Sequence, residues 1–233
     1  MDQSVSDDSR GRFERIYREL RRRISLLDYP PGTRLSETDL AAEFGTSRTP
    51  LRRVLGRLEA EGLLLSLHGV GTMVTDPAPG ELDQVFRLRV QLAELAGTLD
   101  ARLPEAGEMA GFDDLRLRAA ALRKFPEARA FCILNLDFFH AHLALIGNEP
   151  LREVTERLYY RTTRIWLQSV LITRIELADE AAIFEREVED FVAALRIRDL
   201  RAAAMVNAAH ISMSFTRMRK LRGAAPATDE GAR

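Results

Sequence analysis

Ser47, Arg48, Thr49 and Arg52 place hydroxyl and guanidinium groups at the start of a predicted helix. Hydroxyl groups, unpaired backbone N–H groups and the positive end of the helix dipole all favour an anion at such a position. Arg48 and Arg52 are four residues apart and share one helix face, from which guanidinium groups can donate paired hydrogen bonds to phosphate or guanine. These residues favour contact with a nucleic acid.

Three short helices are predicted around these residues. Apolar residues at helical spacing predict the first over residues 13–27, and the segment "PPG" at 30–32 ends it with a turn. A second helix, capped by Ser36, is predicted to run to residue 44. The third is capped by Ser47 and closes at Glu61-Gly62, with its apolar residues facing the first two.

A β-hairpin is predicted over residues 63–75, "LLLSLHGVGTMVT", with His68 and Gly69 at its tip. Three helices and a hairpin within residues 10–75 indicate a winged helix-turn-helix. In that motif the second helix of the pair enters the major groove, and the wing tip can approach the minor groove.

The rest of the chain has a helical period. The segment "DPAPGE", residues 76–81, is predicted to be a linker. Residues 82–222 are predicted to form an all-helical bundle, in which the stripe of Val85, Leu88, Leu92, Leu95 and Leu99 begins the apolar pattern. Residues 223–233 are expected to be a disordered tail. The fold class is therefore mainly α.

Composition excludes several classes of protein. No apolar run approaches the roughly 18 residues of a spanning helix, the N-terminus lacks a secretory signal, and the single cysteine, Cys132, excludes an intramolecular disulfide. We therefore expect a cytoplasmic protein without membrane contact. Although the net charge is −1, residues 10–75 carry twelve arginines against eight acidic residues, a net charge of +4, which favours a polyanionic partner there.

Residues 13–75 resemble the GntR family of bacterial transcription regulators in "PPGTRLSETDLAAEFGTSRTPLRRVLGRLEAEGLL" and "HGVGTMV". The resemblance implies a double-stranded DNA operator as partner. The DNA-binding residues expected on this basis, together with the helix caps, are Ser36, Ser47, Arg48, Thr49, Arg52, His68 and Gly69. The chain departs from the family at Thr38, where some relatives have arginine, and at Arg53, where an acidic residue is usual.

Residues 82–222 look like the helical effector domain of the FadR branch, also called FCD, in "FRLRVQLAELAG", "DFFHAHLALIGNEPL" and "FVAALRIRDLRAAAMVNAAH". This resemblance implies a homodimer on a pseudo-palindromic operator. It also implies control by a small carboxylate metabolite, and a repressor of genes for small organic acid metabolism is the leading hypothesis.

The resemblance further implies a divalent metal site, zinc- or nickel-like, in the bundle. His140 and His210 match two of its ligands, but Leu136 and Val188 occupy the other two positions, so the site looks incomplete even with Asp137 as a substitute. No cofactor is therefore required.

Direct effector binding by Arg89, His140, Asn207 and His210 is the preferred alternative to a metal, because a guanidinium and two imidazoles suit an anion. His142, two residues from His140, is expected at the surface or an interface.

Two other classes of function remain open. A metal-dependent helical-bundle enzyme needs paired Glu-x-x-His motifs, and neither His140 nor His210 has a glutamate three residues before it. An architectural DNA-binding protein needs no effector pocket. We expect a regulator rather than an enzyme.

Overall fold

The computed structural model describes residues 2–172 and 177–224. The chain divides into two compact units. The first comprises Met1–Glu81 and Tyr159–Ile165, and the second comprises Leu82–Leu158 and Trp166–Arg233. Helix dominates both, as the sequence predicts, and the named strands all belong to the first unit. None of the described helices is both long and apolar enough to cross a membrane.

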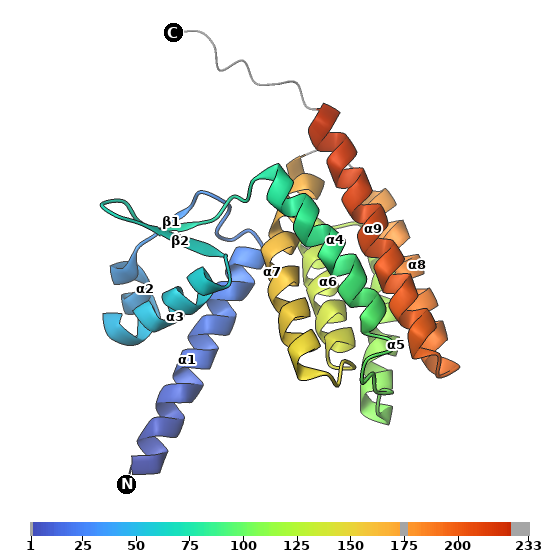
Figure 1. Ribbon diagram of the computed structural model, residues 1–233, viewed down its shortest axis with the longest axis horizontal. Helices are drawn as coiled ribbons and strands as arrows, with labels where there is room; N and C mark the ends of the chain where they lie inside the picture. Colours follow the sequence, from blue (N-terminus) through green and yellow to red (C-terminus); the bar gives the residue numbers. More distant parts are fainter. Residues whose placement is uncertain (1, 173–176, 225–233) are drawn as a thin grey trace. The chain divides into compact units, whose positions relative to one another are not determined.

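The first unit is a winged helix-turn-helix (Figure 1). Its elements are α1 (Asp2–Ser25), β1 (Arg34–Leu35), α2 (Glu37–Glu43), α3 (Arg48–Ala60), β2 (Leu64–Leu67) and β3 (Gly71–Val74). The three strands are antiparallel in the order β1-β3-β2, with Met73 of β3 opposite both Arg34 and Leu65. Helix α1 begins at Asp2, eleven residues before the predicted start at Phe13.

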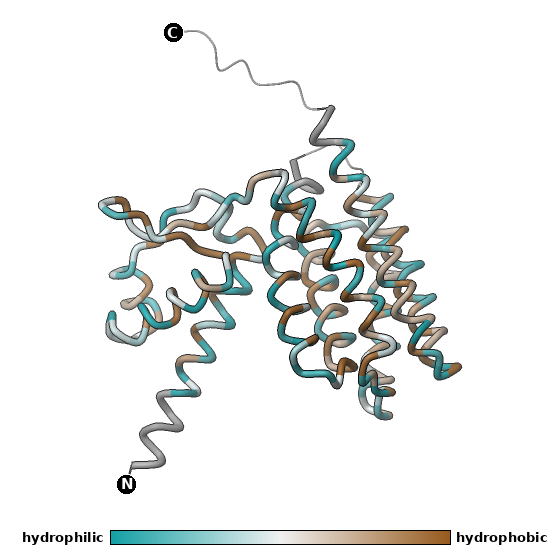
Figure 2. Tube along the Cα trace, viewed as in Figure 1, coloured by the Kyte–Doolittle hydropathy of each residue, from teal (hydrophilic) through white to brown (hydrophobic). Residues whose placement is uncertain are grey.

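One apolar core holds this unit together. Apolar residues of α1 and α3 are almost fully buried, together with Leu64 and Val74 of the sheet. The trace of β2 is hydrophobic along most of its length (Figure 2), but Leu65 and Leu67 of that strand are exposed. The buried side chains include Ile16, Leu20, Ile24, Leu51, Val54, Leu55, Leu58, Leu64 and Val74. The apolar spacing on the predicted first and third helices therefore marks the faces that pack together.

The two predicted helix caps differ. The Ser36 side chain accepts a hydrogen bond from the Asp39 N–H at 3.3 Å and caps α2 as expected. Ser47 is the N-cap residue of α3, but its hydroxyl makes no capping hydrogen bond.

A buried arginine joins the segment Tyr159–Ile165 to the rest of the first unit. Arg164 is fully buried and donates from Nη2 to the hydroxyl and the carbonyl of Thr75, at 2.6 and 3.0 Å. Burial lowers the pKa of this guanidinium to about 10. It remains charged at neutral pH, so its hydrogen bonds must offset the cost of removing it from water.

The second unit contains the helices α4 (Pro79–Leu95), α5 (Ala106–Lys124), α6 (Ala128–Leu143), α7 (Glu149–Ile172), α8 (Leu177–Arg196) and α9 (Leu200–Ala224), apart from the residues that cluster with the first unit. They lie side by side as a bundle (Figure 1). Because α4 begins at Pro79, only the first half of the predicted 76–81 linker lacks helix. Helix α9 includes the first two residues of the predicted 223–233 tail, and residues 225–233 lie outside the described residues.

Aromatic side chains form the centre of the bundle. Phe138 of α6 meets Phe184 and Phe191 of α8 edge-on, with ring centroids 5.6 and 5.2 Å apart. The predicted apolar stripe of α4 is partly wrong as a core pattern, since Leu88 and Leu95 remain 47% and 45% exposed. Val85 of the stripe is buried, together with Leu82, Phe86 and Ala93, which the stripe did not include.

Candidate nucleic-acid interface and interior polar site

The predicted DNA-binding residues all lie at the surface of the first unit. They come from three places: the start of α2, the start of α3 and the hairpin tip. Each of Ser36, Ser47, Arg48, Thr49, Arg52, His68 and Gly69 is exposed. Because the Ser47 hydroxyl is not used as a cap, it is available to a phosphate at the α3 N-terminus.

Hydrogen bonds connect the two arginines of α3 to the start of α2. Arg48 Nη2 donates to Thr38 Oγ1 at 2.8 Å, and Arg52 Nε donates to Glu37 Oε2 at 2.7 Å. Both guanidinium groups are thus oriented by α2 before any ligand binds. Sequence reasoning missed Glu37, because residues fifteen positions apart on two helices become neighbours only through the tertiary fold.

The wing tip is a tight turn. The Val70 N–H donates to the Leu67 carbonyl at 3.1 Å, and Gly69 between them has φ +76°. A type II turn requires a positive φ at its third residue, which favours glycine there. The turn leaves His68 exposed at the tip, where an imidazole can reach a groove edge.

A further arginine, Arg34 of β1, lies beside the wing. Together with Ser36, Glu37 and Thr72 it lines an open groove of about 420 Å³. A Cβ at Gly71 would be only 3.4 Å from Arg34 Nε, so the guanidinium lies against the wing backbone. Sequence reasoning did not single out Arg34, because a lone arginine before a short strand has no distinguishing pattern.

We expect Arg48→Ala or Arg52→Ala to weaken specific DNA binding by about 1–3 kcal/mol, because each removes a guanidinium aimed at base edges or phosphates. Fluorescence anisotropy with a selected operator measures the loss, and circular dichroism checks the fold. Arg157→Ala, an exposed arginine of the second unit, is the matched control. Unchanged operator affinity in both α3 variants would contradict this placement of the recognition helix.

Glu37→Gln should loosen discrimination between DNA sequences. Losing the carboxylate frees Arg52 and removes a negative charge near the phosphates. The affinity for DNA of arbitrary sequence is then expected to rise about two- to fivefold. This factor corresponds to roughly 0.5–1 kcal/mol, the energy of an exposed ion pair. The ratio of operator to random-duplex affinity should fall. An unchanged or higher ratio would show that Glu37 does not orient Arg52.

The second unit buries a histidine that the sequence analysis placed at the surface. His142 is buried, whereas His140 is exposed, so the two expected positions are reversed. His142 Nδ1 donates to the Phe138 carbonyl at 3.1 Å, and its Nε2 lies 3.4 Å from the Asn207 amide nitrogen. The side chain of Asn207 is also buried, as expected of an interior polar residue.

His210 is buried beside a glutamate that sequence reasoning missed. Its Nδ1 lies 2.9 Å from Glu187 Oε2, although the pair does not meet hydrogen-bond geometry, and its Nε2 is 3.3 Å from Ser214 Oγ. Glu187 precedes Val188, the residue that the resemblance aligns with a metal ligand. A carboxylate therefore lies beside His210 at this place, one residue before the apolar Val188.

The three candidate metal ligands are not assembled. Asp137 pairs with Arg118 at 2.6 Å, His140 is exposed, and His210 contacts Glu187 instead. Among the described residues no three histidine, cysteine, aspartate or glutamate side chains are grouped as metal ligands require. The residues present therefore do not fit the divalent metal that the resemblance implies.

A small cavity adjoins His142 and Asn207. It is lined by residues of α4, α6, α8 and α9, including Ala93, Phe191 and Ala204. Its volume is about 20 Å³, room for about one water molecule. Arg89 lies near enough to lower the pKa of His142 and its guanidinium is 5.4 Å from the Phe86 ring centroid.

Stability should depend on the protonation of His142. Burial lowers the pKa of its imidazole to about 4 in the folded chain, whereas an unfolded chain binds this proton with a pKa near 6.5. Between these two pH values the imidazole is protonated in the unfolded chain and neutral in the folded chain. Stability is then lost as the pH falls, by about 3 kcal/mol between pH 7 and pH 4. Urea unfolding of wild type and His142→Gln at both pH values isolates this contribution. Equal losses in the two proteins would contradict it.

The gntR family of bacterial regulatory proteins matches residues 12–74. YdhC of Bacillus subtilis (strain 168), an uncharacterized HTH-type transcriptional regulator, is 32% identical over 159 residues, which cover 68% of this chain and 71% of that protein. The histidine utilization repressor of Klebsiella aerogenes is 39% identical over 84 residues, 36% of this chain and 34% of its own.

A solved structure extends the likeness to both units. E. coli McbR/YncC aligns with a TM-score of 0.78 over 90% of this chain and 97% of that chain, at 20% identity. At that identity the match shows a shared fold.

Proposed function

Because the chain belongs to the GntR family of bacterial transcription regulators, we propose that it acts as a homodimeric, ligand-responsive repressor of the FadR type. The chain is a DNA-binding transcriptional regulator, and its relatives are regulators rather than enzymes. The proposal adds an operator, a dimer and an effector. Such a regulator acts on the bacterial chromosome, in the cytoplasm.

One observation carries the DNA-binding part of the proposal. The starts of α2 and α3 are joined by the Arg48–Thr38 and Arg52–Glu37 hydrogen bonds. In a helix-turn-helix this end of the recognition helix enters the major groove. Phosphates would bind the serine and threonine hydroxyls of α3, base edges would accept from Arg48 and Arg52, and His68 would reach the minor groove.

Exposed apolar side chains support the homodimer. Leu88, Leu95 and Leu99 of α4 and the turn after it are 47%, 45% and 42% exposed, and Met205 and Met213 of α9 are about half exposed. The two helices are neighbours, since the Phe86 and Phe215 rings stack with centroids 4.5 Å apart. Exposed apolar side chains on two neighbouring helices favour burial against a second protein surface. A second copy is the partner that a pseudo-palindromic operator requires.

The effector part rests on the buried polar side chains of the bundle. His142, Asn207 and His210 replace the expected set of His140, Asn207 and His210, with Arg89 supplying positive charge nearby. A small carboxylate metabolite is the proposed ligand, because Arg89 and the Asn207 amide offer donors. The cavity holds about one water, so the effector must displace side chains to enter.

Selection from sheared genomic DNA of the source organism tests the proposal. We expect the purified protein to retain a few intergenic fragments that share a short inverted repeat. Adding the metabolites implied by the adjacent genes should lower operator affinity at least tenfold in wild type. His210→Gln should retain operator affinity and lose this response.

The alternatives give other results. Enriched sites whose affinity no metabolite changes would indicate an architectural protein, and a single half-site would contradict the dimer. Absence of enrichment at low salt, where phosphate contacts are strongest, would contradict operator binding itself.

A further inference from the structure

We propose that the exposed arginine face of α1 is a second phosphate-binding surface, which contacts the DNA backbone beside the site occupied by α3. The inference rests on DNA binding by the first unit. It assigns DNA contacts to residues outside the helix-turn-helix pair and the wing, and it predicts a longer footprint on the operator.

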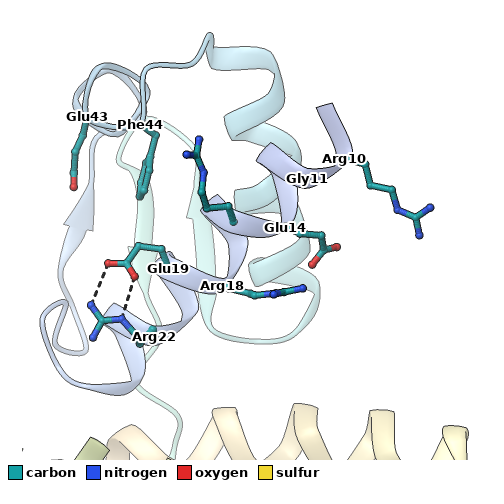
Figure 3. Close-up of a pocket in the computed structure, with 9 residues that line it drawn as sticks. Arg10, Gly11, Glu14, Arg18, Glu19, Arg22, Glu43 and Phe44 are labelled. Atoms are coloured by element: carbon teal, nitrogen blue, oxygen red, sulfur yellow. Dashed lines mark hydrogen bonds and ion pairs between the residues drawn. The ribbon is translucent and has the colours of Figure 1, made fainter. Parts of the chain in front are cut away.

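A broad groove lies between this face of α1 and the end of α2 (Figure 3). Its volume is about 840 Å³, and Arg10, Arg15, Arg18 and Arg22 contribute its cations. In Figure 3 the Arg10 and Arg18 side chains extend outward from the helix rather than into the core. Over residues 10–23 seven arginines stand against two glutamates, a net charge of +5.

The carboxylates beside the groove are already neutralised. Glu14 pairs with Arg57 at 2.9 Å, and Glu19 and Glu43 pair with Arg23 at 2.7 and 2.6 Å. Glu19 also pairs with Arg22 of the groove, at 3.0 Å, as the dashed lines in Figure 3 show. The positive charge that these carboxylates leave unpaired belongs to Arg10, Arg15 and Arg18.

Three arginines of this face have no counterion in the described part of the chain. The three side chains, those of Arg10, Arg15 and Arg18, are exposed. None of these guanidinium groups forms an ion pair or hydrogen bond with a described residue. From Arg10 to Arg18 the helix rises by about 12 Å. A row of separated cations on an open surface matches a chain of phosphates, whereas a single small anion needs converging donors in an enclosed site.

Packing fixes this face relative to the recognition helix. The Arg57 guanidinium of α3 lies 3.8 Å from the Tyr17 ring centroid of α1, and the Tyr17 hydroxyl donates to Glu61 at the end of α3 at 2.7 Å. In Figure 1 the hairpin tip and α2 lie at the left of the first unit, and the N-terminal half of α1 extends below α2 and α3. A duplex held by α3 can therefore meet α1 without rearrangement of the unit.

The test compares two double variants with the same loss of charge. Arg15→Gln/Arg18→Gln removes two counterion-free cations of α1. Arg157→Gln/Arg186→Gln removes two exposed arginines of the second unit that likewise have no described partner. The ligand is a duplex of arbitrary sequence, about 40 base pairs or four helical turns long. Fluorescence anisotropy gives Kd over a range of salt concentrations.

We expect the slope of log Kd against log salt concentration to be smaller in the α1 variant by about two per DNA-binding unit. Each lost arginine accounts for about one, because one phosphate no longer has a cation beside it. Its affinity at low salt should fall at least tenfold, while the control variant matches wild type. Thermal melts should agree among the three proteins, because all four side chains are exposed.

A slope and affinity equal to wild type in the α1 variant would overturn the second surface and leave operator binding intact. An equal weakening in both double variants would also overturn it, since net charge alone would then account for the effect. If wild type itself fails to bind the duplex at low salt, DNA binding and this inference fall together.

Discussion

The packing of α1 against α3 is the interaction on which the first unit depends. A helix of thirteen residues such as α3 is marginal in isolation, so its position comes from its contacts. Ile16, Leu20 and Ile24 of α1 are completely buried, and so are Leu51 and Leu58 of α3. Burying each such side chain contributes about 1.5–3 kcal/mol. The same contact therefore holds the recognition residues and the arginine face of α1 in one rigid arrangement.

The surface proposed to face DNA is organised in the free protein. In the free protein Arg48 and Arg52 already donate to side chains of α2, which restricts their rotamers and reduces the entropy lost on binding. In the proposed complex, contact of either arginine with a base would replace its acceptor on α2 by an acceptor on the base. A mismatched base would offer a poorer acceptor, yet the arginine would still lose its hydrogen bond to α2. The difference between these two hydrogen bonds would then contribute to discrimination between DNA sequences.

Local patterns in the sequence predicted much of the first unit. The Ser36 cap, the short helices and the glycine-bearing hairpin depend on residues that are close in the chain. The interior of the bundle was harder to predict. Successive residues of a helix are about 100° apart around its axis, and α6 has apolar residues on nearly every side, so the spacing does not indicate which face is buried. For this reason the predicted positions of His140 and His142 were reversed: His140 is exposed and His142 is buried. Glu187 was missed because the residue that it contacts, His210, lies on another helix. The apolar spacing of α4 indicated a core face, although Leu88 and Leu95 are exposed.

The close approach of α4 and α9 has a mechanical consequence. A Cβ at Gly97, which follows α4, would lie 2.5 Å from the Ala204 Cβ of α9, and alanines of both helices line the small cavity beside Asn207. Nothing larger than a water fits there unless the two helices separate. Their outer faces carry the exposed leucines and methionines, so occupancy of the interior would change the curvature of the outer surface on which a second protomer would pack.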